Sequence, residues 1–183
     1  VYKAIEIMRN GRKGPVWLDI PINIQGQQYI KSEQKEFIIK KEKPKNIDLQ
    51  AKLLSEAIAN SKRPLLMVGG GLRTSGAVKN LERFIDNHNI PVVSAYNGHD
   101  LFWESNNKYI GRSGTQGDRR GNLAVECSDL IIALGTSLNI RQIGYNYNDF
   151  ASEKYLCYID IDSEELKKKT IKNNVDLPIN SDI

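Results

Sequence analysis

Glycines and an arginine follow apolar runs at two points of this chain, and together they could bind a ligand that carries phosphate groups. Gly69-Gly70-Gly71 comes directly after Leu65 to Val68, and Arg141 lies in the loop after Leu130 to Leu134. Glycine lets the backbone approach a pyrophosphate, and the start of a helix at the same place favours an anion. Three glycines alone fit a tight strand-to-helix turn equally well.

A second glycine-rich segment, Gly111 to Gly121, places two arginines at the start of the helix that we expect next. Arg119 and Arg120 fall in the first turn, where a cation opposes the helix dipole at a cost of about 0.3–1 kcal/mol each. Either a bound phosphate or a neighbouring carboxylate, such as that of Asp118, would offset this cost. Both explanations remain open from the sequence.

Two carboxylates end another apolar run. Asp160 and Asp162 follow Tyr155 to Ile159, a position from which an acidic side chain often contacts a ribose hydroxyl, although one of them could simply cap the helix that follows. No His, Cys and Asp residues have metal-ligand spacing, and no Ser-His-Asp arrangement or G-x-S-x-G segment stands out. The sequence therefore predicts a binding site, with no catalytic or metal-binding residues.

The elements that must position these residues alternate between strand and helix from residue 47 onward. Leu130 to Leu134 is an unbroken apolar run, as a strand buried on both faces requires. Strands are also expected at Leu65–Val68, Ile90–Ser94, Tyr155–Ile159 and Val175–Pro178. This alternation predicts an α/β fold with a parallel sheet covered on both faces, whose strand-ending loops share one edge.

The first 46 residues follow a different pattern. Val1 to Met8 has helical spacing, Gly11 ends that helix, and Val16 to Ile20 is expected to form a short strand. Residues 26–46 are rich in Lys, Gln and Glu without a clear period, which favours a linker between domains. Because the chain opens at Val1 within a helical pattern, we expect it to be cut from a longer protein.

Composition narrows the class of protein. The 183 residues are 40% hydrophobic and 26% charged, which is typical of a soluble globular protein, and no apolar run has the length of a membrane span. The net charge is +4, but the lysines are interleaved with glutamates and no groove-reading motif occurs, so we expect no nucleic-acid partner. Cys127 and Cys157 adjoin apolar segments, which predicts buried thiols and a reducing, cytoplasmic location.

Taken in order, these segments resemble the acetolactate synthase-like branch of the thiamine diphosphate-dependent enzymes. No single segment is diagnostic, but the set is specific and runs along essentially the whole chain. The segments are Gly11–Pro21, Arg63–Gly71, Ile90–Val93, Asn97-Gly98, Gly111–Asn122, Ser128–Gly135, Arg141–Gly144 and Ile159–Asp162.

The resemblance implies a Rossmann-like, doubly wound, six-stranded parallel sheet over residues 47–183, the central domain of a three-domain chain. Residues 1–25 would then end the preceding pyrimidine-binding domain, and residues 26–46 would link the two. In relatives the central domain holds FAD in a non-redox role, or ADP, or nothing. The cofactor contacts would carry over to Gly70, Gly71, Gln116, Gly117, Gly135, Arg141, Asp160 and Asp162.

Two positions depart from the family pattern. Flavin-binding members usually carry an arginine where this chain has Ser137 and an aspartate where it has Asn139. Losing a charged contact to a diphosphate costs about 1.5–3 kcal/mol. The resemblance therefore leaves FAD, ADP and an empty site as alternatives for this domain.

The resemblance also implies what the full-length parent does. The family's catalytic glutamate lies upstream of the matching region and its Gly-Asp-Gly metal motif lies downstream, so thiamine diphosphate and Mg²⁺ would be bound by the parent and not by this part. The parent would decarboxylate a 2-keto acid such as pyruvate, transfer the two-carbon unit, and form a homodimer or homotetramer. This part alone would be inactive and would pack against the other two domains. A free-standing nucleotide-binding module and a scaffold without ligand are the alternatives.

Overall fold

The computed structural model describes residues 1–28, 46–102, 106–171 and 173–183. By its internal contacts the chain divides into two units, Val1–Lys43 and Pro44–Ile183. Most of the linker predicted over residues 26–46 lies outside the described residues. The boundaries of the three predicted segments therefore remain predictions.

The first unit contains helices α1 (Tyr2–Arg9) and α2 (Ile22–Gln25) within residues 1–28. Gly11 follows the end of α1 with a positive φ of 62°, in agreement with the predicted helix end. The strand predicted over residues 16–20 is wrong, since these residues are irregular and Trp17 is 92% exposed. A strand needs a hydrogen-bonded partner, and the described part of this unit provides no second strand.

The second unit is built on a parallel sheet in the order β3-β2-β1-β4-β5-β6. The strands are β1 (Pro64–Val68), β2 (Val92–Ser94), β3 (Tyr109–Arg112), β4 (Leu130–Leu134), β5 (Tyr155–Asp160) and β6 (Leu177–Asn180). This order is that of a doubly wound, Rossmann-like sheet. The predicted fold class is confirmed.

One strand escaped the sequence prediction. β3 occupies the start of the glycine-rich segment that was expected to be a loop, and it lies at the edge of the sheet. Its pairing with β2 shifts register between Val92 and Val93. Gly111 has a φ of 141° within it, so this strand depends on a backbone conformation that glycine favours.

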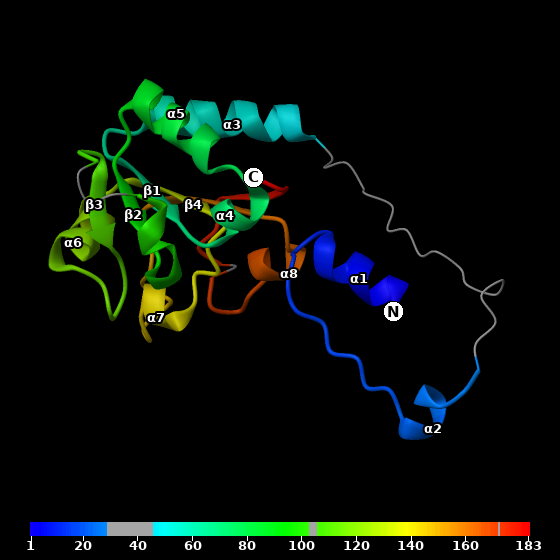
Figure 1. Cartoon of the computed structure of the whole chain (residues 1–183). Helices are drawn as coiled ribbons and strands as arrows, with labels where there is room; N and C mark the ends of the chain where they lie inside the picture. Colours follow the sequence, from blue (N-terminus) through cyan, green and yellow to red (C-terminus); the bar gives the residue numbers. More distant parts are fainter. Residues whose placement is uncertain (29–45, 103–105, 172) are drawn as a thin grey trace. The chain divides into compact units, whose positions relative to one another are not determined.

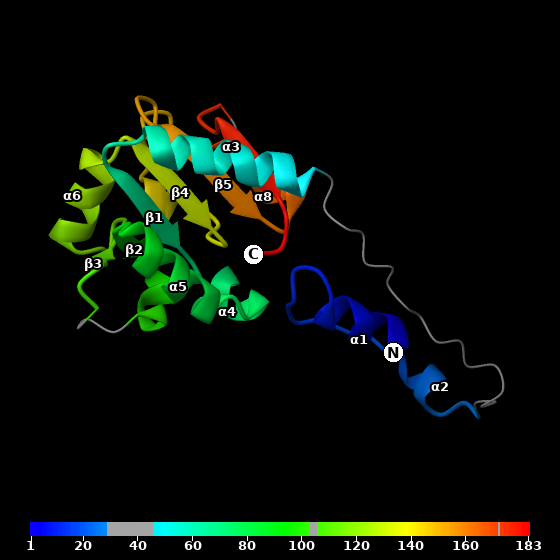
Figure 2. The ribbon, with the colours of Figure 1, turned by 90° about the horizontal axis from the view of Figure 1, so that it is seen from above.

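Helices cover both faces of the sheet (Figures 1 and 2). Helices α3 (Ile47–Asn60), α4 (Gly71–Ser75) and α5 (Val78–His88) pack on one face, together with the 3-10 turn η2 (Tyr96–Leu101). Helices α6 (Arg119–Cys127), α7 (Ile140–Ile143) and α8 (Ser163–Leu166) pack on the other. Within β1, Leu66 and Val68 face the first layer while Leu65 and Met67 face the second.

The two cysteines are free and lie in different surroundings. Cys157 is buried in β5, and burial raises the pKa of its thiol to about 12, with a further contribution from Asp176. Cys127 is exposed, so the prediction of a buried thiol is wrong there, because the last residue of α6 faces outward. In the part of the chain that the structure describes, no helix combines the length and the apolarity needed to span a bilayer.

Candidate functional site

The loops that follow the strands lie along one edge of the sheet, as the parallel arrangement requires. Between β1 and β4 the strand order reverses, and a crevice is expected there. The two loops at that point are hydrogen-bonded to each other, since the Gly71 N–H donates to the Gly135 carbonyl at 2.9 Å and the Gly69 N–H donates to the Leu134 carbonyl at 3.1 Å. The Gly135 N–H in turn donates to the Ile159 carbonyl of β5 at 3.1 Å.

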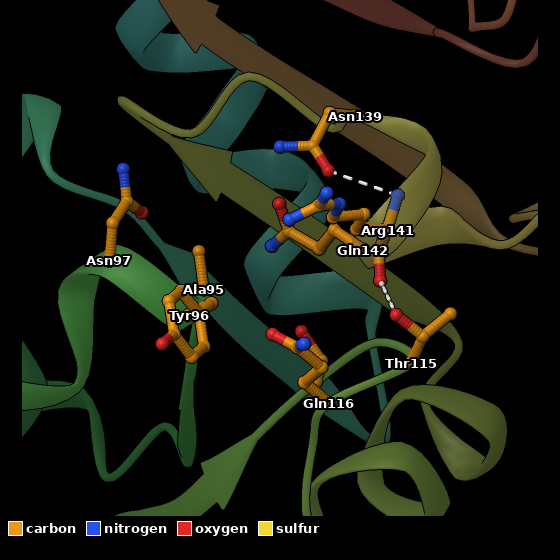
Figure 3. A pocket seen from close by; sticks show the side chains of 9 residues that line it. Ala95, Tyr96, Asn97, Thr115, Gln116, Asn139, Arg141 and Gln142 are labelled. Carbon is orange, nitrogen blue, oxygen red and sulfur yellow. Dashed lines mark hydrogen bonds between the residues drawn. The ribbon is translucent and has the colours of Figure 1, made fainter.

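An open pocket of about 190 Å³ lies at this edge (Figure 3). Its walls come from the segments that follow β2, β3 and β4, and they contain Ala95, Tyr96 and Asn97, then Ser113, Thr115 and Gln116, then Asn139, Arg141 and Gln142. Figure 3 shows the Arg141 and Gln142 side chains extending from α7 toward the Ala95–Asn97 segment. The pocket therefore joins parts of the chain that are distant in sequence.

Backbone contacts fix the wall formed by the β3 loop against α7. The Thr115 N–H donates to the Arg141 carbonyl at 2.7 Å, and the Thr115 hydroxyl donates to the same oxygen at 3.2 Å. A Cβ atom at Gly114 would lie 2.4 Å from that carbonyl oxygen, so the close approach requires glycine. The two walls hold a fixed spacing because of these contacts.

The positions where the chain departs from the flavin-binding pattern have structural contacts here. The Ser137 carbonyl accepts a hydrogen bond from the Lys168 Nζ at 2.9 Å, which ties the β4 loop to the segment after α8. The Asn139 Oδ1 accepts from the Arg141 N–H at 3.0 Å and so caps α7. Both contacts help to keep the loop in place.

Replacing Asn139 with alanine should lower the free energy of unfolding by about 1 kcal/mol, the usual effect of losing an N-cap. Asn139→Asp should keep full stability, because a carboxylate oxygen can accept the same hydrogen bond. Urea unfolding of the two variants beside the parent measures the difference. Equal losses in both variants would show that the cap is not what position 139 contributes.

Arg141 supplies the charge of the pocket. Among the described lining residues none is Asp or Glu, and the exposed Arg141 guanidinium has no hydrogen bond or ion pair with another described residue. Gln116, also exposed, lies on the facing wall. A pocket with one cation, several neutral donors and no carboxylate is suited to an anionic group.

Of the eight predicted cofactor contacts, the structure places Gln116 and Arg141 in the pocket. Gly70 lies next to it, since a Cβ atom there would be 3.5 Å from the Nδ2 of Asn97. Gly71 and Gly135 form the contact between the β1 and β4 loops described above. Gly117 does not line the pocket, and a Cβ atom there would lie 2.5 Å from the Arg112 carbonyl oxygen. A ligand role for each of these residues remains a prediction.

The two predicted aspartates lie at the end of β5, outside the pocket lining. The Asp160 Oδ1 accepts from the Asp162 N–H at 2.9 Å, and the Asp162 Oδ1 accepts from the Glu164 N–H at 3.0 Å. Asp162 is thus the N-cap of α8. From the sequence alone, helix capping and contact with a ribose hydroxyl were both open for these aspartates. Their described hydrogen bonds shape the turn from β5 into α8.

A carboxylate lies at the start of α6, near one of the two arginines there. The Asp118 side chain accepts hydrogen bonds from the Arg112 N–H at 2.9 Å and from the Arg112 guanidinium at 3.1 Å. The hydrogen bond from the Arg112 side chain lowers the pKa of Asp118 most, and attraction to Arg120 adds to the effect. Asp118 therefore provides the negative charge at this helix start, and Arg119 and Arg120 are not part of the pocket.

Two pocket residues had no signal in the sequence. Ser113 and Gln142 are buried, yet the Ser113 Oγ and the Gln142 Nε2 have no hydrogen-bond partner in the described structure. Both residues lie within segments that carry the family resemblance, but no ligand contact was predicted for either, and only the fold reveals that they share a pocket.

A metal site requires several ligand side chains close together. No cluster of three or more His, Cys, Asp or Glu side chains that could hold a metal ion occurs among the described residues. These residues therefore do not fit the Mg²⁺ that accompanies thiamine diphosphate.

Comparisons with known proteins agree with this architecture. The family described as thiamine pyrophosphate enzyme, central domain, matches residues 51–183. A probable acetolactate synthase large subunit of Methanocaldococcus jannaschii is 35% identical over 98% of this chain, and the acetolactate synthase large subunit of Lactococcus lactis is 31% identical over 100%. Acetolactate synthase 2, chloroplastic, of Nicotiana tabacum is 34% identical over 92%.

The chain spans only part of each relative: 30% of the Methanocaldococcus protein, 32% of the Lactococcus protein and 26% of the Nicotiana protein. The family match nevertheless covers most of the present chain, including every strand of its sheet. Sequence and fold agree on one conclusion: this protein belongs to the thiamine pyrophosphate enzyme family, and residues 51–183 match the family's central domain.

Proposed function

We propose that this chain is part of an acetolactate synthase-like enzyme that uses thiamine diphosphate and Mg²⁺ to decarboxylate a 2-keto acid such as pyruvate and to transfer the two-carbon unit. The names of the relatives and their similarity along nearly the whole chain support this proposal. The chain spans about a third of their length or less, which supports placing the activity in a longer protein. We expect that protein to be a homodimer or homotetramer. Thiamine diphosphate supplies the carbanion chemistry when bound elsewhere in that protein.

Within that protein the second unit acts as a scaffold that binds an adenine nucleotide, either ADP or FAD. The observation that carries this part of the proposal is the pocket whose one charged, described lining residue is the unpaired Arg141. Gly70 leaves room for a ligand beside it, because the nearest atom to a Cβ placed there, the Asn97 Nδ2, would be at an ordinary contact distance of 3.5 Å. The phosphates of the nucleotide would lie against Arg141 and Gln116 at the switch point of the sheet.

Titration calorimetry of the protein with ADP and with FAD tests nucleotide binding. Arg141→Gln should weaken binding about tenfold, because one charge-assisted hydrogen bond to phosphate is lost. Arg119→Gln is the matched control, since Arg119 is exposed on α6 and does not line the pocket. Binding of neither nucleotide by the parent protein, or equal losses in both variants, would contradict the proposal and favour a scaffold without ligand.

Formation of acetolactate from pyruvate tests the enzyme activity separately. The full-length protein is expected to require both thiamine diphosphate and Mg²⁺, and the 183-residue chain alone is expected to form none. Activity of the 183-residue chain alone would overturn the assignment of the chemistry to other parts of the parent.

A further inference from the structure

Two unpaired buried polar atoms meet in one pocket. Among the described residues, Gln50, Ser113 and Gln142 each have a buried side-chain polar atom without a hydrogen-bond partner. Ser113 and Gln142 line the same pocket, although they follow different strands, and Gln50 lies apart from them on α3. A buried donor without an acceptor costs about 1–3 kcal/mol, so two such donors together point to a ligand that pairs them.

The amide of Gln142 is held in one orientation. The Thr136 hydroxyl, on a side chain that is 3% exposed, donates to the Gln142 Oε1 at 2.8 Å. This contact occupies the amide oxygen and leaves the Nε2 as a donor without an acceptor. Gln142 is only 8% exposed, so this donor is largely removed from bulk solvent.

Ser113 offers a second donor, from the β3 loop that packs against α7. It is 5% exposed and directly follows β3, and its N–H is already used by the Ser94 carbonyl at 3.1 Å. Its hydroxyl has no hydrogen-bond partner among the described residues. The described lining also carries Arg141 and no carboxylate. Three groups of the pocket therefore lack a hydrogen-bond partner among the described residues: the Gln142 amide nitrogen, the Ser113 hydroxyl and the Arg141 guanidinium. All three can donate hydrogen bonds to the oxygens of a phosphate.

We propose that Gln142 and Ser113 form the inner end of the pocket and bind a phosphate group of the nucleotide, with Thr136 as the positioning residue for Gln142. This inference rests on the nucleotide-binding function proposed above. It favours ADP over FAD, because the terminal phosphate of ADP has three free oxygens and more negative charge, whereas both phosphates of FAD are esterified and each has only two free oxygens. Both donors have essentially no accessible surface, so binding requires neighbouring side chains of the pocket to shift.

Calorimetry with ADP, FAD and inorganic pyrophosphate tests this selectivity. The parent protein should bind ADP more tightly than FAD, and Gln142→Met should weaken ADP and pyrophosphate about tenfold while changing FAD less. Ser113→Ala should also weaken the binding of ADP and pyrophosphate. It tests the same proposal if Gln142→Met folds poorly. Gln50→Met is the matched control, since it removes the other unpaired glutamine without touching the pocket.

Two substitutions at position 136 test the positioning role. Thr136→Val keeps the shape but removes the hydroxyl, so it should lower the preference for ADP, whereas Thr136→Ser keeps the hydroxyl and should restore it. If Thr136 has a purely structural role, the two variants should prefer ADP over FAD to the same degree, even if they differ in stability.

The outcomes separate this inference from the function on which it rests. Suppose that the parent binds ADP, and that Gln142→Met and Ser113→Ala prefer ADP over FAD as much as the control Gln50→Met does. The inference is then wrong, and nucleotide binding stands. If neither nucleotide binds but pyrophosphate does, and Gln142→Met weakens it, the phosphate site stands without the nucleotide. Absence of all binding by the parent overturns both.

Discussion

Gly69→Ala should lower the free energy of unfolding by about 3 kcal/mol, the effect of forcing an extra carbon into a packed interior. A Cβ atom at Gly69 would lie 2.5 Å from the carbonyl oxygen of Gly135 and 2.7 Å from the Cα of Thr136. Both atoms belong to the backbone of the β4 loop, which is itself bound to the β1 loop and to β5. The clash therefore cannot be relieved by rotating a side chain.

Gly70→Ala is the control for this substitution and should unfold at nearly the same urea concentration as the parent. Its Cβ atom would have the Asn97 Nδ2 as nearest neighbour, at 3.5 Å, and its φ of −61° suits any residue. The prediction fails if the two alanine variants are equally stable. The comparison also separates two uses of adjacent glycines, because Gly69 serves packing while Gly70 leaves room for a ligand.

Asp129→Asn should remove about 2 kcal/mol of stability at neutral pH. The Asp129 carboxylate, just before β4, accepts hydrogen bonds from the Lys62 and Arg63 N–H groups at 2.9 Å each and from the Ser61 hydroxyl. These groups connect the end of α3 to the start of β1, next to β4. Burial opposes the charge, but the hydrogen bonds outweigh it and lower the pKa of Asp129 from 3.8 to about 2.

The direction of the pH dependence follows from that shift. Because the folded pKa lies below the unfolded value, the contribution of Asp129 is complete above pH 4 and is lost as the pH falls through 2. Urea unfolding at pH 7, 4 and 2.5 should therefore show the parent and Asp129→Asn converging in stability under acid conditions. Asp86→Asn is the control, since Asp86 is an exposed carboxylate on α5. Its stability should change with pH as that of the parent does. A constant gap between the parent and Asp129→Asn would refute the assigned cause.

The sheet was predictable wherever a strand is apolar on both faces. β1, β4 and β5 each bury consecutive residues against both helical layers, so an unbroken apolar run marks them. β3 could not be found this way, because it is a short edge strand whose Gly111 reads as loop. Residues 16–20 gave the opposite error, since an apolar run predicts a strand only where a partner strand exists.

The candidate site was predictable in part. Glycines after strands and the loop residues Gln116 and Arg141 are recognisable because their types suit phosphate contacts. Ser113 and Gln142 have ordinary side chains for a surface loop, and only their burial without partners distinguishes them. That property depends on which strands are neighbours, and no local pattern encodes it.

The strand order also determines when the sheet can be completed during synthesis. β1 pairs with β2 on one side and with β4 on the other, yet β4 leaves the ribosome only after β2 and β3. A nascent chain that ends at Cys127 exposes one edge of β1, whose residues are apolar on both faces. Such an unpaired edge is a template for wrong pairing. Chaperone binding during translation should therefore be strongest between the emergence of β1 and that of β4.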